Sequence, residues 1–154
     1  MNKTFSVSNE LAREAAINAI RQLDISTPHE VAIKPVKRNR TAAQNGLYFH
    51  WVGCIANYSG DDKESMHEYL KGQFLLPIFV RDDNGYAALF AVVQDAMQEG
   101  GERAKKAMAA LKKETSITKA SQGQMREYLD EISRMCANQG IPLTVPDQYR
   151  WLGI

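Results

Sequence analysis

The spacing of apolar positions along the chain predicts a mostly helical protein. In several segments apolar side chains recur every three or four residues, which places them on one face of an α-helix. The clearest segment is 41–58, where Leu47, Trp51 and Ile55 stand four residues apart. Other helices are expected at 9–23, 61–76, 86–98, 102–113 and 121–138. We expect their apolar faces to form the core, with Trp51 inside it.

Three shorter segments carry patterns that are typical of strands. Lys3–Val7 alternates weakly, and 29–36 places Val31 and Ile33 on one side of an extended chain. The continuous apolar run 75–80 is a third candidate strand, and the Asp-Asp-Asn-Gly sequence that follows it predicts a turn. The expected fold class is α+β, mostly helical, with a small N-terminal sheet of two or three strands and helices packed on it.

The helix caps, glycines and prolines along the chain indicate one domain over residues 1–154. Ser121 and Gln124 have the spacing of a capping box, and Gly140 is placed to end the helix that they begin. The tail after Gly140 contains two prolines and is expected to be extended. We find no internal repeat, linker or low-complexity segment.

Composition and charge narrow the class of protein. The hydrophobic fraction of 44% and the charged fraction of 24% are ordinary for a globular chain. No apolar run approaches the roughly 20 residues that span a bilayer, and the N-terminus lacks the apolar centre of a signal peptide, so we expect a cytoplasmic protein. The free thiols of Cys54 and Cys136 are expected to be buried.

The net charge of +1 is unevenly distributed. Residues 1–60 hold seven Lys and Arg against four Asp and Glu, whereas 61–154 hold twelve against fourteen. Binding to phosphate would therefore depend on local patches and would be modest and sensitive to salt.

The strongest local signal for function lies around the start of the helix at 41–58. Four cations precede it: Lys34, Lys37, Arg38 and Arg40. Thr41 and Gln44 have the spacing of a capping box, and the helix continues with Asn45 and the aromatic residues Tyr48 and Phe49. Cations bind phosphate, amides contact polar edges and aromatic rings stack on bases, so the segment indicates a nucleic-acid contact. A strand end, a capped helix and a core stripe with surface charge nearby would give the same residues.

Motifs for catalysis and metal binding are weak. His67 is not followed by the second histidine of a zinc-protease motif, and no phosphate-binding glycine loop or nucleophile elbow is present. His50 and Cys54 share a helix face, but the sequence offers no third group to orient them. We expect no catalytic residue, no metal site and no cofactor. A nuclease with a metal held by His50, His67 and nearby carboxylates stays open as a competing hypothesis.

Three segments resemble a known family when they are taken in order. RNRTAAQNGLYFHW, then DDKESMHEYLKGQFLLPIF, then SITKASQGQMREYLDEISRMCANQGIPL are similar to the phage recombination protein family NinB, also called Orf. The positions that match its central element are Arg40, Gln44, Asn45 and Trp51, and Lys71 matches a helix position loosely. Residues 86–113 look like a helical insertion relative to that family, and the C-terminal extension is short.

The resemblance implies a non-enzymatic accessory in phage DNA recombination, located in the host cytoplasm. It implies a homodimer that binds single-stranded DNA and works with a single-strand-binding protein and a phage recombinase. A protein–protein adaptor without DNA binding is the main alternative. The DNA-binding residues expected from the pattern and the resemblance together are Lys34, Lys37, Arg38, Arg40, Gln44, Asn45, Tyr48, Lys71, Lys105 and Lys106.

Overall fold

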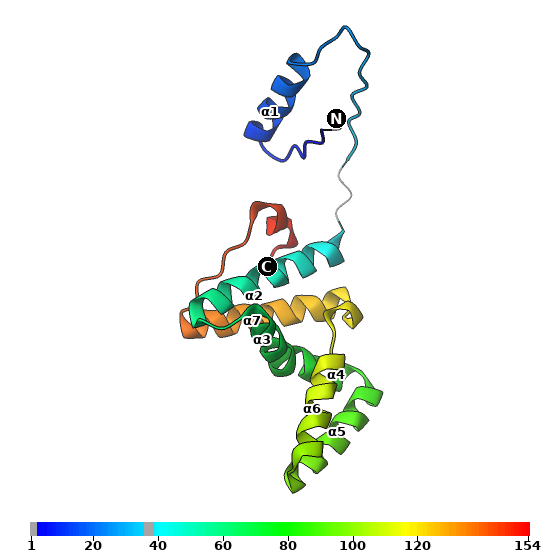
Figure 1. Cartoon of the computed structure of the whole chain (residues 1–154), viewed down its shortest axis with the longest axis vertical. Helices are drawn as coiled ribbons and strands as arrows, with labels where there is room; N and C mark the ends of the chain where they lie inside the picture. Colours follow the sequence, from blue (N-terminus) through cyan, green and yellow to red (C-terminus); the bar gives the residue numbers. More distant parts are fainter. Residues whose placement is uncertain (1–2, 36–38) are drawn as a thin grey trace. The chain divides into compact units, whose positions relative to one another are not determined.

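The computed structural model describes residues 3–35 and 39–154, and these ranges contain seven α-helices (Figure 1). The chain divides into two units, Met1–Arg38 and Asn39–Ile154. Within the described ranges no helix combines the length and apolar character that a bilayer crossing requires. The expectation of a single domain over 1–154 stays a prediction.

The predicted α+β class is wrong, because residues 3–35 and 39–154 contain no β-strand. Residues 3–8 and 28–35 are irregular. Neither segment is paired with another described segment by the backbone hydrogen bonds that make a strand. Val31 is 54% exposed and Ile33 is 97% exposed. An alternating apolar pattern is typical of a strand with one buried side. A strand also needs a second segment whose backbone pairs with it, and the pattern does not show one.

The described part of the first unit, residues 3–35, contains one helix, α1 (Glu10–Arg21). The side chain of Asn9 caps it by accepting a hydrogen bond of 2.8 Å from the backbone N–H of Ala12. The predicted helix is confirmed, but no residue of α1 is buried, and Leu11 is 82% exposed. Its predicted apolar face therefore contributes nothing to the core.

The core of the second unit lies where α2 (Arg40–Ser59) packs against α3 (Lys63–Leu70) and α7 (Gln122–Gln139). Both of the longest predicted helices are confirmed. Trp51 is buried as expected, with 2% exposure, and Cys136 is buried whereas Cys54 is half-buried. The largest fully buried side chains also include Leu47, Tyr48, Ile55, Leu70, Leu75, Met125, Tyr128, Leu129 and Ile132.

Two capping boxes were predicted, and only the one at the start of α7 is present. Ser121 and Gln124 form it as expected, each accepting a hydrogen bond from the backbone of the other. At α2 the cap is Asn39, whose side chain accepts from the backbone N–H of Ala42, so α2 begins before Thr41. Gln44 therefore lies inside the helix and does not form the capping box that was expected of it.

The predicted strand at 75–80 is helical. A turn of π-helix, η1 (Lys71–Leu75), continues α3 directly into α4 (Leu76–Asp82). Pro77 stands in the first turn of α4, where a proline is tolerated, so the helix predicted at 61–76 is followed directly by another. Leu75, Ile78 and Phe79 are buried, so the apolar run covers more than one face of a buried helix.

Two helices form a hairpin between α4 and α7. The side chain of Asp83 caps α5 (Asn84–Glu99) by accepting from the backbone N–H of Tyr86, and Gly100 and Gly101 turn the chain at φ of 79° and 97°. The chain then enters α6 (Glu102–Glu114). In Figure 1 α5 and α6 extend away from the packed α2, α3 and α7. These are the helices predicted at 86–98 and 102–113.

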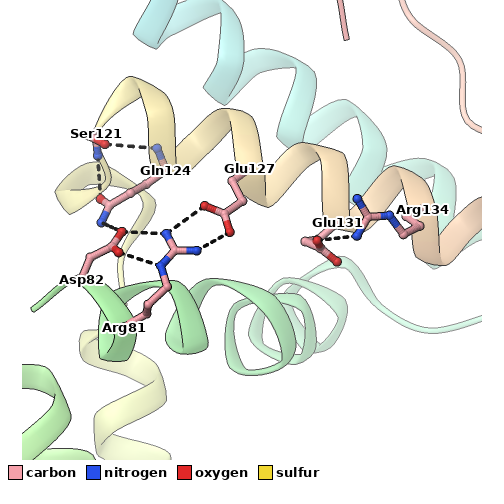
Figure 2. A network of polar contacts seen from close by, with 7 residues as sticks. All are labelled: Arg81, Asp82, Ser121, Gln124, Glu127, Glu131 and Arg134. Carbon is pink, nitrogen blue, oxygen red and sulfur yellow. Dashed lines mark hydrogen bonds and ion pairs between the residues drawn. The ribbon is translucent and has the colours of Figure 1, made fainter.

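A polar network fixes α4 against α7 at the base of the hairpin (Figure 2). The guanidinium of Arg81 donates to Asp82 at 2.7 Å and to Glu127 at 2.6 Å, and Gln124 donates to Asp82 at 3.0 Å. Arg81 holds the pKa of Asp82 at about 2 and lowers that of Glu127. Gln124 thus belongs both to the capping box and to the α4–α7 contact.

The C-terminal segment runs along α2. A 3₁₀ turn, η2 (Ile117–Lys119), precedes α7, and another, η3 (Asp147–Leu152), lies in the tail that was predicted to be extended. The indole N–H of Trp51 donates to the carbonyl of Thr144 at 2.9 Å. The ring of Tyr149 lies so close to Gly46 that any Cβ there would overlap it. The tail is therefore held against α2 at Gly46 and Trp51, which are five positions apart.

Candidate nucleic-acid interface

The four cations expected to form one basic segment belong to different parts of the chain. Lys34 is exposed in the first unit, and Lys37 and Arg38 lie outside the described residues. Arg40 is the first residue of α2, half-buried, and its guanidinium donates to the carbonyl of Leu152 at 3.5 Å. Within the second unit, Arg40 is thus the member of this group that the structure places.

The amides expected to contact a ligand have mainly structural positions. Gln44 is fully buried, and its side-chain amide donates to the carbonyl of Gln122 at 3.0 Å, which joins α2 to the start of α7. Asn45 is half-buried. Its side-chain oxygen and that of Gln44 are buried without a hydrogen-bond partner among the described residues. Gln44 is therefore enclosed away from solvent.

Tyr48 was expected to be an exposed ring, and this expectation is wrong. It is fully buried, and its hydroxyl accepts a hydrogen bond of 3.1 Å from Tyr128. The same hydroxyl lies 2.6 Å from Nδ1 of His67, so Tyr48 connects the centre of the core to α3. Burial raises the pKa of both tyrosines, which keeps their hydroxyls protonated.

Lys71 is also enclosed. Its side chain is 5% exposed, and its Nζ lies 2.7 Å from a carboxylate oxygen of Glu68. Lys71 is the first residue of the π-helical turn Lys71–Leu75 and is buried there, whereas the resemblance placed it at a DNA contact. A buried and paired ammonium is not presented to phosphate.

An aromatic surface lies next to these buried groups. The ring of Phe49 is 53% exposed, and its centroid lies 5.6 Å from the imidazole of His67 with 38° between the planes. Behind Phe49, the ring of Tyr48 is in edge contact at 5.1 Å. Burial, and then the charge of Lys71, lower the pKa of His67, so this imidazole is neutral near pH 7. The pair presents one exposed ring supported by a fixed, uncharged one.

A glycine and a lysine extend this surface along the same two helices. Gly53 follows Phe49 by one turn on α2, and Lys63 precedes His67 by one turn on α3. The stem of Lys63 crosses Gly53 so closely that a Cβ on the glycine would lie 3.6 Å from Cε of the lysine. We call Phe49, Gly53, Lys63 and His67 the α2–α3 face. It combines a stacking surface with an exposed cation.

The remaining predicted cations lie on α6. Lys105 and Lys106 are exposed near the Gly100-Gly101 turn, at the end of the hairpin away from the packed helices (Figure 1). Lys105 lies 3.6 Å from Glu102 in an exposed pair. These two lysines and the α2–α3 face are therefore on different parts of the second unit.

His50 and Cys54, the two residues that could form a nucleophile pair, have a third neighbour that is uncharged. Nε2 of His50 lies 2.7 Å from the hydroxyl of Thr144 and 3.7 Å from Sγ of Cys54. A nucleophilic triad needs a group that orients and charges the histidine, usually a carboxylate, and Thr144 supplies no charge. No cluster of three His, Cys, Asp or Glu side chains suited to a metal occurs in residues 3–35 or 39–154.

Comparison of the chain with models of protein families, with curated proteins and with solved structures gave no match. The similarity to the NinB family thus stays a prediction from the sequence.

Sequence reasoning named Phe49 and His67 separately and did not name Lys63. His67 was considered as a metal ligand, whereas the structure places it against Phe49. The one-turn spacing pairs Phe49 with Gly53 on one helix and Lys63 with His67 on the next, but only the packing of the two helices brings the pairs together.

Proposed function

We propose that this protein is a single-stranded-DNA-binding accessory in recombination and that the α2–α3 face contacts the bases. The observation that carries the proposal is the exposed ring of Phe49, 53% accessible and held against the imidazole of His67. An apolar ring that is this exposed and supported from behind suits a planar ligand. Bases of a single strand offer such planes, whereas those of a duplex are already stacked.

The chemistry of the face suits binding without strong sequence preference. Stacking of a base on an aromatic ring contributes roughly 1–3 kcal/mol and is available to every base. His67 is neutral near pH 7, so it supports Phe49 as a ring and adds no charge. Lys63 and Arg40 belong to the same unit and supply phosphate contacts.

The NinB resemblance adds the expected setting of this activity. A protein of that kind would act as a homodimer alongside a single-strand-binding protein and a phage recombinase. The inserted helices at 86–113 would then be a feature of this chain beyond the common fold. These partners are part of the proposal.

The proposal is tested by fluorescence anisotropy of labelled single-stranded and duplex oligonucleotides at low salt. We expect preferential binding of the single strand and a loss of about fivefold or more in affinity for Phe49→Ala, as expected for one stacked base. The matched control is Tyr58→Ala, which removes another exposed α2 ring, 58% accessible, and should bind as the parent does. Equal affinities of the parent and Phe49→Ala would contradict the assignment of the face.

A second function is favoured by a different observation, the exposed apolar side of α5. Leu89 and Val92 are 51% and 67% exposed on one face of the hairpin. An adaptor that binds protein through this hairpin would bind neither oligonucleotide at low salt. Incubation of the same oligonucleotides with Mg²⁺ separates both candidates from a metal-dependent nuclease, which would cleave them.

A further inference from the structure

A cavity of about 540 Å³ opens among α4, α5 and α6, and we call it the hairpin pocket. Most of its wall is apolar and comes from Leu76, Pro77 and Val80 of α4, Phe90 of α5 and Met108 of α6. Leu76 is 3% exposed, whereas the other four side chains are at least partly open to solvent. The volume lies within the roughly 300–1,000 Å³ of sites that hold small molecules. The hairpin pocket therefore has the size and the wall of a site for an apolar ligand.

Two methionines make the wall adaptable. Met108 belongs to the middle of α6, and Met97 stands three residues before Gly100 on α5, near the turn of the hairpin. Met97 is 39% exposed. A methionine side chain is unbranched and polarisable, so it can move to cover an apolar ligand of irregular shape. Covering these side chains removes apolar surface from water, which favours binding.

One cation without a partner stands at the opposite end of the pocket from Met97. Lys112 of α6 lines the pocket, is exposed and forms no ion pair within residues 39–154. Its stem lies across Gly72, where an added Cβ would be 3.0 Å from Cε of the lysine. Arg81, the other cation of the lining, is already bound to Asp82 and Glu127. Gly72 therefore gives the ammonium of Lys112 its place at the edge of the apolar wall.

The acids around this end of the hairpin do not neutralise Lys112. No carboxylate is among the described residues that line the pocket. The flanking acids all have other roles: Glu68 pairs with Lys71, Asp82 and Glu127 pair with Arg81, Glu114 pairs with Lys119, and Asp83 caps α5. The lining thus combines a long apolar surface with a single available positive charge.

We propose that the hairpin pocket binds the anion of a free aliphatic carboxylic acid. The carboxylate pairs with Lys112, and the chain lies between α5 and α6 with its far end at Met97. A nucleotide or a sugar would bring many polar groups to a wall that offers them few partners, and unpaired polar groups are costly to bury. An organic cation would meet Lys112 and no carboxylate.

The first test concerns the charge. Isothermal titration calorimetry of the full chain with decanoate, below the concentration at which decanoate forms micelles, should show saturable binding to one site. Lys112→Gln should weaken this binding about threefold to fivefold, as expected for an ion pair at the edge of a site. The matched control is Lys113→Gln, which removes the neighbouring exposed cation outside the lining and should bind as the parent does. Decyltrimethylammonium has the same chain with a positive head and should bind more weakly than decanoate.

The second test concerns the apolar wall. Met97→Glu should weaken decanoate binding about tenfold or more, because a carboxylate would have to be covered by the apolar chain. Val92→Glu places the same group on α5 at a side chain that is 67% exposed and outside the lining, and it should bind as the parent does. A circular dichroism spectrum like that of the parent verifies that each variant is folded.

Several outcomes would overturn the proposal. A parent chain that shows no saturable binding of decanoate has no such site, and equal binding of the cationic probe would remove the carboxylate as the recognised group. Equal affinities of Lys112→Gln and Lys113→Gln, or of Met97→Glu and Val92→Glu, would place the ligand elsewhere. Cosedimentation with phosphatidylglycerol vesicles, without decanoate binding, would assign the surface to a bilayer in place of a free acid. None of these outcomes depends on DNA binding.

Discussion

The hydroxyl of Tyr48 connects the centre of the core to the surface imidazole of His67. It accepts from Tyr128 and lies 2.6 Å from Nδ1 of His67, to which it donates its own proton in the tautomer whose Nδ1 carries no hydrogen. This direction requires that Nδ1 be unprotonated, which agrees with the lowered pKa of the imidazole. A buried tyrosine thus sets the state and orientation of the ring that supports Phe49.

Removal of that hydroxyl should destabilise the protein. In Tyr48→Phe the hydroxyl of Tyr128 loses its acceptor while it stays fully buried. An unsatisfied buried group of this kind costs about 2 kcal/mol of the free energy of unfolding. Urea denaturation at neutral pH measures the loss, and Tyr58→Phe, at an exposed ring, should leave the free energy unchanged. A loss of the same size in both variants would show that the internal hydroxyl chain is not its cause.

The lowered pKa of His67 predicts a direction for stability against pH. The folded state disfavours the imidazolium form of His67. The resulting contribution of His67 to the free energy of unfolding is therefore complete above the ordinary pKa of 6.5. It is lost as pH falls from 6.5 through the lower pKa of the folded state. His67→Gln has no titrating group at this position. We expect the free energy of unfolding of the parent to fall relative to His67→Gln between pH 7.5 and about 5. A constant difference across this range would contradict the assignment.

At the scale of helices and strands, local signals decided some boundaries well and others poorly. Helices were predictable wherever periodic apolar positions coincided with a cap, as at Ser121 and Gly140. The N-terminal strands were not, because alternation over Lys3–Val7 says nothing about whether a partner strand exists. The strand predicted at 75–80 failed for a different reason: a short, fully apolar run suits a buried helix equally well.

Equivalent caps on different helices should differ in their effect on unfolding. Ser121 caps α7, which is packed in the core, so Ser121→Ala should lower the free energy of unfolding by about 1 kcal/mol. Asn9 caps α1, which buries no side chain, so Asn9→Ala should leave the main thermal transition unchanged. Calorimetry of both variants measures the contrast. Equal shifts in the two variants would mean that α1 unfolds together with the core.

At the scale of the whole molecule, the net charge is small, so electrostatic attraction depends on local groups of charged side chains. That any phosphate contact would come from local patches stays a prediction from the small net charge. Tyr48 and Lys71 share their residue types with exposed DNA contacts, and only packing shows that both are enclosed. Lys63 gains its place from the proximity of α2 and α3, which one-dimensional spacing does not contain.

The salt dependence of binding should show how few phosphates are contacted. Each contact on a single strand contributes about 0.7 to the slope of log affinity against log salt. We expect Lys63→Ala to lower the slope by about 0.7. The control Arg134→Ala removes an exposed cation that is paired with Glu131 at 2.6 Å and should leave the slope unchanged. Anisotropy titrations at several salt concentrations measure both, and an unchanged slope in Lys63→Ala would remove that residue from the contact.

The π-helical turn at Lys71–Leu75 has a consequence for how the chain tolerates changes in length. This turn already accommodates one residue more than an α-helical turn, and successive residues of an α-helix are about 100° apart, so insertion of a further residue would rotate everything that follows by that amount. Arg81 would then point away from Glu127, and the hairpin would face a new direction. Many substitutions in this turn preserve its length, whereas a one-residue insertion would change the direction of three helices at once. Related chains that share this arrangement are expected to vary in composition here and to keep the residue count.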